Sequence, residues 1–186
     1  MIYDVVEISH DASSGVSDTS YYQLKTYWAD TFVDNEGRVA REFHRFVRDS
    51  INHPWQLKDA WTGIIDGIRG ELVEENQRKV KLVFSPTLQK YWNANAYNTS
   101  DALDCYYRDI HRDTTINGVL FDSTLVVEQA MSYSFIDTVR KYEMYAKDVG
   151  LIYKHFREIS YQPIGQISLI DQGKELYMTY VSHGFE

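Results

Sequence analysis

Residue types that often bind metals are present in this chain, but their spacing matches no known metal site. The six histidines show neither the HExxH pattern nor a close pair at helical or strand spacing: His10, His44, His53, His111, His155 and His183. A cysteine-rich zinc site is excluded, because Cys105 is the only cysteine. We therefore predict no metal and no cofactor, while a three-ligand site assembled by the fold stays open.

A run of aspartates superficially resembles a calcium site. Asp101, Asp104, Asp109 and Asp113 lie close together in the sequence, but they lack the glycine and the final glutamate of an EF-hand loop. Solvated acids are the preferred interpretation of this run.

Motifs for nucleophilic catalysis, phosphate binding and glycoside hydrolysis are not found either. There is no GxSxG turn, and Cys105 lies in a strand-like run where a small buried hydrophobic role is expected. The glycines at 63, 67 and 70 lack the Lys-Ser/Thr ending of a phosphate loop. Glu74 and Glu75 are adjacent acids whose geometry the sequence does not fix. The catalytic residues are therefore unknown, and a hydrolase with an unrecognised site remains an alternative.

The remaining chemical feature is aromatic. Five rings are expected in or beside loops, where they can stack on sugars or line an apolar groove: Trp55, Trp61, Tyr91, Trp92 and Tyr97. The competing interpretation, which we prefer, is that these rings cap the ends of a sheet. They are the weak candidates for a ligand site.

The composition indicates a soluble, acidic domain that does not bind nucleic acid. The 186 residues carry a net charge of −8, whereas a nucleic-acid surface needs a basic face. Four arginines, at 38, 41, 45 and 48, alternate with acids and are interpreted as a solvated face. Fifteen tyrosines favour strands over helices. The length suits one domain spanning residues 1–186.

Most segments alternate as strands do. Strands are expected over 2–9, 21–33, 56–65, 104–112, 119–131 and 174–182, with hairpin turns at 34–37 and at Asn117-Gly118. Segments 38–49 and 151–161 fit either a strand or one face of a helix, and we prefer strands.

Some turns and short helices are also predicted. A helical turn is expected over 71–76 and a short helix or loop over 133–140, with an irregular stretch over 87–102. Gly150 is expected to mark a bulge between two aromatic runs, and residues 171–173 to form the turn of a final hairpin. The predicted fold is mainly β: a curved antiparallel sheet, as a half-barrel or sandwich, with one or two short helices.

Several segments carry a likeness to known proteins. They are the run from Trp55 onward, with ENQR at 75–78 leading into KVKLVF and WNANAYN at 92–98, and FDSTLVVEQ at 121–129, YAKDVGLIYK at 145–154 and ELYMTYVSHG at 175–184. Together they resemble a group of uncharacterised secreted bacterial lipoproteins. The resemblance implies an extracytoplasmic β domain, tethered to the membrane by a lipid-bearing cysteine upstream of this chain. The chain starts directly in an expected strand, so we expect further sequence before Met1.

These observations lead to three functional hypotheses. The first is a non-enzymatic extracytoplasmic lipoprotein domain that binds a small apolar or glycan ligand. The second is a structural or assembly subunit of the cell envelope that docks a protein partner through an apolar patch. The third is the hydrolase with an unrecognised site, which requires a pocket of perturbed acids and histidines.

Overall fold

The computed structural model describes residues 1–12, 16–164 and 167–184, and every regular element in these ranges is a β-strand. The strands are β1 (Ile2–Asp11), β2 (Val16–Val33), β3 (Val39–Arg48), β4 (Gln56–Asp66), β5 (Arg69–Glu74), β6 (Gln77–Val83), β7 (Tyr91–Asn93), β8 (Asp104–Ile116), β9 (Val119–Tyr133), β10 (Asp137–Ala146), β11 (Gly150–Ile164) and β12 (Ile167–Ser182). The predicted mainly β fold is confirmed. The predicted short helices are wrong for the described ranges.

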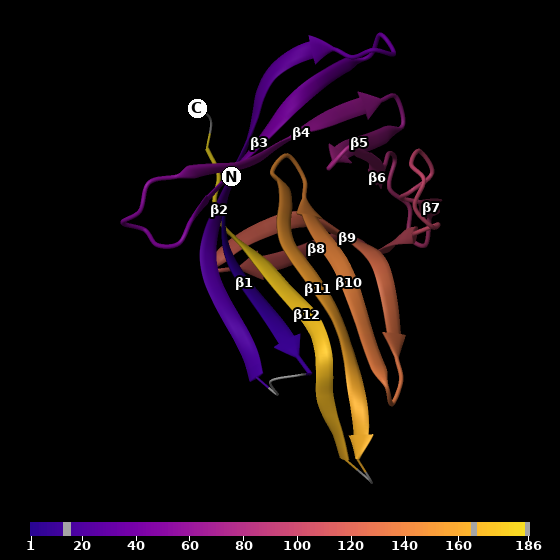
Figure 1. Ribbon diagram of the computed structural model, residues 1–186. Coiled ribbons are helices and arrows are strands. Elements are labelled where there is room, and N and C mark those ends of the chain that lie inside the picture. The colour runs from indigo at the N-terminus through magenta and orange to yellow at the C-terminus, as the bar shows by residue number, and fades with distance from the viewer. Residues whose placement is uncertain (13–15, 165–166, 185–186) are drawn as a thin grey trace.

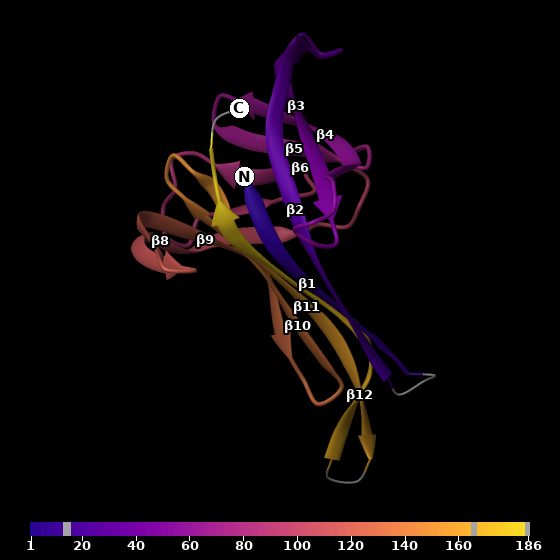
Figure 2. The same ribbon diagram turned by 90° about the vertical axis from the view of Figure 1, so that its left-hand side faces the viewer.

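The strands form one antiparallel sheet in the order β6-β5-β4-β3-β2-β1-β12-β11-β10-β9-β8-β7. Figures 1 and 2 show this sheet curling until its two edge strands approach each other. Hydrogen bonds from the Val80 amide to the Ala94 carbonyl, at 2.9 Å, and from the Trp92 indole to the Val80 carbonyl, at 3.0 Å, join the edges. The result is a nearly closed barrel and not a two-sheet sandwich.

Tyr107 also holds this junction together. Its buried hydroxyl donates to the Val83 carbonyl at 2.7 Å and accepts from the Val83 amide at 2.9 Å. Edge strands with unpaired backbone groups invite association with other chains. The curl of the sheet therefore protects the edge of β6. In the described residues, no helix is both long and apolar enough to cross a lipid bilayer.

Turn chemistry explains both the correct and the wrong predictions for the hairpins. Asn117 and Gly118 adopt φ values of 48° and 79°, as the predicted two-residue turn requires. Glu75 and Asn76 also have positive φ values, of 48° and 61°. The helical turn predicted over 71–76 is therefore wrong: these two residues join β5 to β6.

Three other local predictions also need correction. Residues 147–149 form the hairpin turn between β10 and β11, so Gly150 does not mark a bulge within one strand. The segment predicted as a short helix or loop over 133–140 is the turn between β9 and β10 followed by the start of β10. No turn interrupts β12 at 171–173. The preferred strands over 38–49 and 151–161 are confirmed as β3 and β11.

Two clusters of buried side chains form the core. The larger one contains Tyr3, Val5, Leu24, Phe121, Ala146, Ile152, Met178 and Tyr180. The smaller one contains Ala94, Cys105, Tyr107 and Val127, which confirms the buried role expected for Cys105. Residues paired directly across strands share a face. We call the face that carries Tyr3, Leu24 and Met178 the inner face.

A buried ion-pair cluster also lies on the inner face. The Glu143 side chain on β10 is 2% exposed and accepts from Lys81 Nζ on β6, at 2.8 Å, and from the Tyr145 hydroxyl, at 2.7 Å. Lys154 Nζ on β11 lies 3.3 Å away. Burial opposes the charged carboxylate, but the lysines Lys81 and Lys154 hold the pKa of Glu143 well below its ordinary value. The cluster thus links strands that are far apart in the order of the sheet.

Candidate functional site

A row of three aromatic rings crosses β2, β3 and β4 on the inner face. Trp28 is paired with Phe43 across β2 and β3, and Phe43 with Trp61 across β3 and β4. The ring centroids lie 4.6 Å apart for Trp28 and Phe43, and 6.3 Å apart for Phe43 and Trp61. Trp28 is 48% exposed. We call these three rings the aromatic row.

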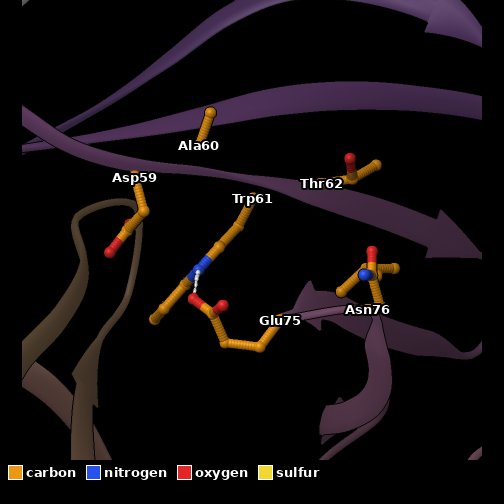
Figure 3. A pocket seen from close by; sticks show the side chains of 7 residues that line it. Asp59, Ala60, Trp61, Thr62, Glu75 and Asn76 are labelled. Atoms are coloured by element: carbon orange, nitrogen blue, oxygen red, sulfur yellow. Dashed lines mark hydrogen bonds between the residues drawn. The ribbon is translucent and has the colours of Figure 1, made fainter.

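A cleft of about 240 Å³ lies beside the last ring of the aromatic row, as Figure 3 shows. Trp61 projects into it, and the Trp61 Nε1–H donates to Glu75 Oε1 at 3.4 Å. Asp59, Thr62 and Asn76 complete its polar lining. The cleft therefore places one large ring beside two carboxylates and an amide.

Arg45 links the Trp61 ring of this cleft to the half-buried carboxylate of Asp59. The guanidinium lies 3.7 Å from the centroid of the Trp61 ring, and its Nε lies 3.5 Å from Asp59 Oδ1. Burial raises the pKa of Asp59, and the charge of Arg45 opposes this effect. Asp59 Oδ1 is buried and accepts no hydrogen bond. It can therefore accept one from a ligand that displaces neighbouring groups.

Gly63 explains how Trp28 fits into the aromatic row. A Cβ atom at Gly63 would overlap the Trp28 indole, so only glycine leaves room for the ring against β4. The edge of the six-membered ring of Trp28 therefore points at the backbone of β4. The strand register and the missing side chain at position 63 together position the row.

The five rings named from the sequence do not gather in one place. Trp61 alone lies in the cleft. The Arg48 guanidinium lies 4.3 Å from the centroid of the Trp55 ring. The Tyr91 and Tyr106 rings stack with their centroids 4.9 Å apart. Trp92 packs on Tyr107 at 4.8 Å, within the smaller core cluster, where it serves the junction of the barrel.

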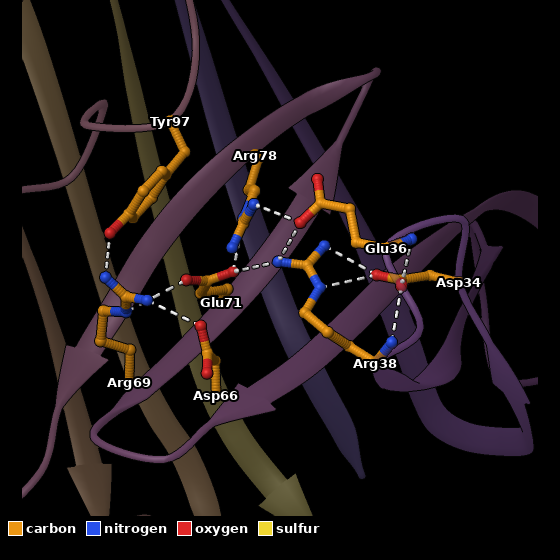
Figure 4. A network of polar contacts seen from close by, with 8 residues as sticks. All are labelled: Asp34, Glu36, Arg38, Asp66, Arg69, Glu71, Arg78 and Tyr97. Atoms are coloured by element: carbon orange, nitrogen blue, oxygen red, sulfur yellow. Dashed lines mark hydrogen bonds and ion pairs between the residues drawn. The ribbon is translucent and has the colours of Figure 1, made fainter.

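Tyr97 belongs to a separate polar network, shown in Figure 4. Its ring lies between the guanidinium groups of Arg69 and Arg78, at 4.7 and 4.5 Å, and its hydroxyl contacts Arg69. Arg78 Nε donates to Glu71 Oε2 at 2.6 Å, and the Glu71 side chain is fully buried. Arg38 reaches the same carboxylate at 3.9 Å. This network fastens the loop after β7 to β5, β6 and the turn between β2 and β3, so we assign it a structural role.

A second cleft, of about 440 Å³, is lined by residues of β1, β11 and β12. Its lining includes Phe156, Glu158, Lys174 and His10. Lys141 already covers the Phe156 ring at 4.6 Å and pairs with Glu158 at 2.6 Å. The phenyl ring of this cleft therefore has a cation as its partner, and His10 is engaged by Ser17 and Glu175, which makes this cleft the weaker candidate for a ligand site.

The opposite face carries a row of three rings in contact on β10, β11 and β12. His155 lies 5.1 Å from the Tyr142 ring and 4.8 Å from the Tyr177 ring, and its buried Nε2 has no hydrogen-bond partner. Burial lowers the pKa of His155, and Arg140 and Arg157 lower it further, against the raising effect of Glu175. The fold therefore favours the neutral form of this imidazole.

This arrangement makes stability depend on pH. The unfolded chain binds a proton on His155 near pH 6.5, whereas the folded protein resists it, so stability is lost as the pH falls below that value. The loss is at most about 1.4 kcal/mol per pH unit for one proton. We expect urea unfolding to show that the free energy of unfolding falls less steeply between pH 7 and 5 in His155→Phe than in the unaltered protein. Equal slopes would contradict the assignment.

Four residues of this site were not predicted from the sequence: Trp28, Phe43, Arg45 and Asp59. Arg45 was interpreted as part of a solvated face, but its side chain is only 15% exposed and lies on Trp61. Strict alternation along β3 could have placed Phe43 and Arg45 on one face. The register that brings Trp28 and Trp61 beside them is a long-range property.

Neither metal-binding side chains nor similarity to known proteins identify a function for this site. In the described ranges, no group of three or more His, Cys, Asp or Glu side chains is arranged to hold a metal ion. No protein-family model matches the chain, and no curated protein matches it either.

Proposed function

We propose that this chain is a non-enzymatic extracytoplasmic binding domain whose ligand is a neutral saccharide. The supporting observation is the cleft beside Trp61, where an aromatic ring adjoins Asp59, Glu75 and Asn76. Aromatic rings offer a flat apolar surface for the C–H groups of a sugar, while carboxylates and amides bind its hydroxyls. The extracytoplasmic location is the part of the proposal that follows from the lipoprotein resemblance.

The lining favours a neutral saccharide over an apolar or an acidic ligand. Carboxylates at the cleft repel an anionic sugar, and the Arg45 guanidinium is already engaged by Asp59 and Trp61. Arg45 covers one face of the Trp61 ring, so a sugar that stacks on this ring requires the opposite face. The exposed Trp28 extends the same surface along the aromatic row.

Calorimetry with a panel of neutral hexasaccharides tests this proposal directly. Cellohexaose, xylohexaose, mannohexaose and chitohexaose are the probes, with a galacturonate hexamer as the acidic comparison. We expect at least one neutral probe to bind, and Trp61→Ala to weaken its affinity at least tenfold, which is about 1.4 kcal/mol.

Trp55→Ala is the matched control for this experiment. Trp55 also packs under an arginine, Arg48, but it lies outside the cleft, so its loss should leave the affinity unchanged. Failure of every neutral probe to bind would contradict the proposal. So would equal losses from Trp55→Ala and Trp61→Ala.

A glycoside hydrolase is the second candidate function, because Asp59 has a raised pKa beside the carboxylate of Glu75. A general acid needs such a raised pKa. Prolonged incubation of the protein with the bound hexasaccharide distinguishes the two functions. New reducing ends that disappear in Asp59→Asn would favour the hydrolase, whereas an intact sugar supports the binding domain.

A further inference from the structure

The last residues of β9 form a free edge of the sheet. In the described ranges, residues 124–133 of β9 pair with β10, whereas the pairing of β9 with β8 ends at Glu128. Residues 130–133 therefore have a neighbouring strand on one side only, and we call them the β9 edge. Figure 1 shows the lower end of β9 at the side of the sheet, with β10 as its one neighbour. A free edge of this kind is a template on which another chain can add a strand.

The backbone groups that point outward from the β9 edge belong to Met131 and Tyr133. At the end of the hairpin, the Ser134 amide donates to the Asp137 carbonyl at 2.8 Å. Hydrogen-bonded and non-hydrogen-bonded pairs alternate along an antiparallel ladder, so Ser132 also bonds to β10. The N–H and C=O groups of Met131 and Tyr133 then point away from β10, toward the open side of the strand.

The β9 edge is complementary to a second copy of itself. In the antiparallel register centred on Ser132, the outward groups of Met131 bond to those of Tyr133 in the second copy, and those of Tyr133 bond to Met131. The two side chains, 57% and 64% exposed, then lie side by side, and a thioether packs favourably on an aromatic ring. Ser132 faces Ser132 of the second copy across the two-fold axis. Such a self-complementary contact closes after two copies.

The distribution of charge favours a second copy as the occupant. Close to a two-fold axis, a charged residue would lie near the same charge of the other copy, and opposed like charges destabilise a sheet. Residues 129–136 contain no charged side chain, although the chain has a net charge of −8. Glu128, which precedes them, is buried and paired with Arg108 and Arg140, and Asp137 lies on β10, one strand behind the edge. Neither acid therefore opposes the pairing of two copies.

The free edge of β8 shows by contrast what a protected edge looks like in this chain. Beyond Tyr107, β8 pairs only with β9 in the described ranges, and three register shifts interrupt this pairing. His111 has a φ of 54°, and the segment 108–113 contains two arginines and two aspartates. Bulges and charges are the usual means of preventing an edge from adding a strand. Residues 130–133 contain no register shift and no charge, so the β9 edge stays open to pairing.

We propose that two copies of this chain associate through the β9 edge and form one continuous sheet across a two-fold axis. Main-chain hydrogen bonds supply the affinity in strand addition of this kind. The contact is short, so the dimer is reversible and not obligate. This inference is independent of saccharide binding, because the aromatic row lies on β2, β3 and β4.

Disulfide cross-linking through position 132 tests the register. In the proposed dimer the two Ser132 residues form a non-hydrogen-bonded pair, whose Cα atoms lie about 4.5 Å apart. Disulfides form at this separation. We therefore expect Ser132→Cys to yield a covalent dimer under mild oxidation, measured by intact mass under non-reducing conditions. Cys105 is buried and does not compete. Leu120→Cys is the matched control: Leu120 is 66% exposed near the β8–β9 turn, away from the β9 edge, and should stay monomeric.

Sedimentation velocity of the full chain over a range of concentrations measures the association itself. We expect a concentration-dependent dimer, and an association constant lower by about tenfold or more in Met131→Pro and in Tyr133→Lys. Met131→Pro removes an outward N–H while the bonds to β10 remain, and Tyr133→Lys introduces like charges near the axis. Leu120→Lys adds the same charge away from the β9 edge and should leave the association unchanged.

Two results would overturn the proposal. One is a monomer at every concentration, together with equal rates of cross-linking for Ser132→Cys and Leu120→Cys. The other is a dimer that persists at full strength in Met131→Pro and Tyr133→Lys, because another surface would then form it. Circular dichroism of each variant confirms that the sheet is intact before the comparison is made.

Discussion

Replacing Lys81 with methionine is expected to lower the free energy of unfolding by about 3 kcal/mol. The substitution removes the 2.8 Å bond to Glu143 and leaves that carboxylate, 2% exposed, with Lys154 and Tyr145 as its partners. Removing one member of a buried ion pair costs more than the bond itself, because the remaining charge stays desolvated. Urea unfolding followed by circular dichroism measures the change.

Lys79→Met is the matched control for this prediction. Lys79 Nζ pairs with Glu74 at 3.2 Å, but its side chain is 32% exposed, so its removal should cost less than about 1 kcal/mol. Glu143→Gln and the double variant complete a double-mutant cycle. A coupling energy near zero between positions 81 and 143 would contradict a role for this pair in holding β6 against β10.

The general fold was predictable because local patterns dominate it. Alternating apolar residues and the Asn117-Gly118 turn specify strands and a hairpin from neighbouring residues alone. The hairpin at 147–149 was missed because Asp148, a non-glycine residue, adopts a φ of 59° there. The turn at Glu75, between β5 and β6, was missed for the same reason. Non-glycine residues at positive φ are uncommon, so the sequence favoured other interpretations.

Closure of the barrel and the assembly of the site were not predictable in this way. The contact between Val80 and Ala94 joins strands at opposite ends of the sheet order, and no local pattern reports it. Trp28, Phe43 and Trp61 meet only because β2, β3 and β4 pair in one register. A shift of one residue would turn each ring to the other face.

The turn predicted at Gly173 is also wrong. Its neighbours suggested a hairpin turn at 171–173, but β12 continues through this position beside β11. Gly173 has a φ of 149°, and a Cβ atom there would overlap the Glu158 carbonyl oxygen and lie 2.7 Å from Ile159 Cα. The glycine therefore permits a close approach of two backbones instead of a chain reversal.

Gly173→Ala is expected to lower the free energy of unfolding by about 3 kcal/mol. Two effects add: the strained φ that an alanine would have to adopt, and the overlap with the backbone of β11, which cannot rotate away as a side chain can. Thermal and urea unfolding of the purified variant measure the loss.

Gly37→Ala separates these two effects, because Gly37 also has a positive φ, of 79°, but no atom lies within 4 Å of a Cβ placed there. It should cost only about 1 kcal/mol, the strain of the backbone conformation alone. Equal losses at the two positions would show that β11 and β12 separate by enough to admit a methyl group. The stacking of His155 on Tyr177, which depends on the same strand pairing, would then need to be reconsidered.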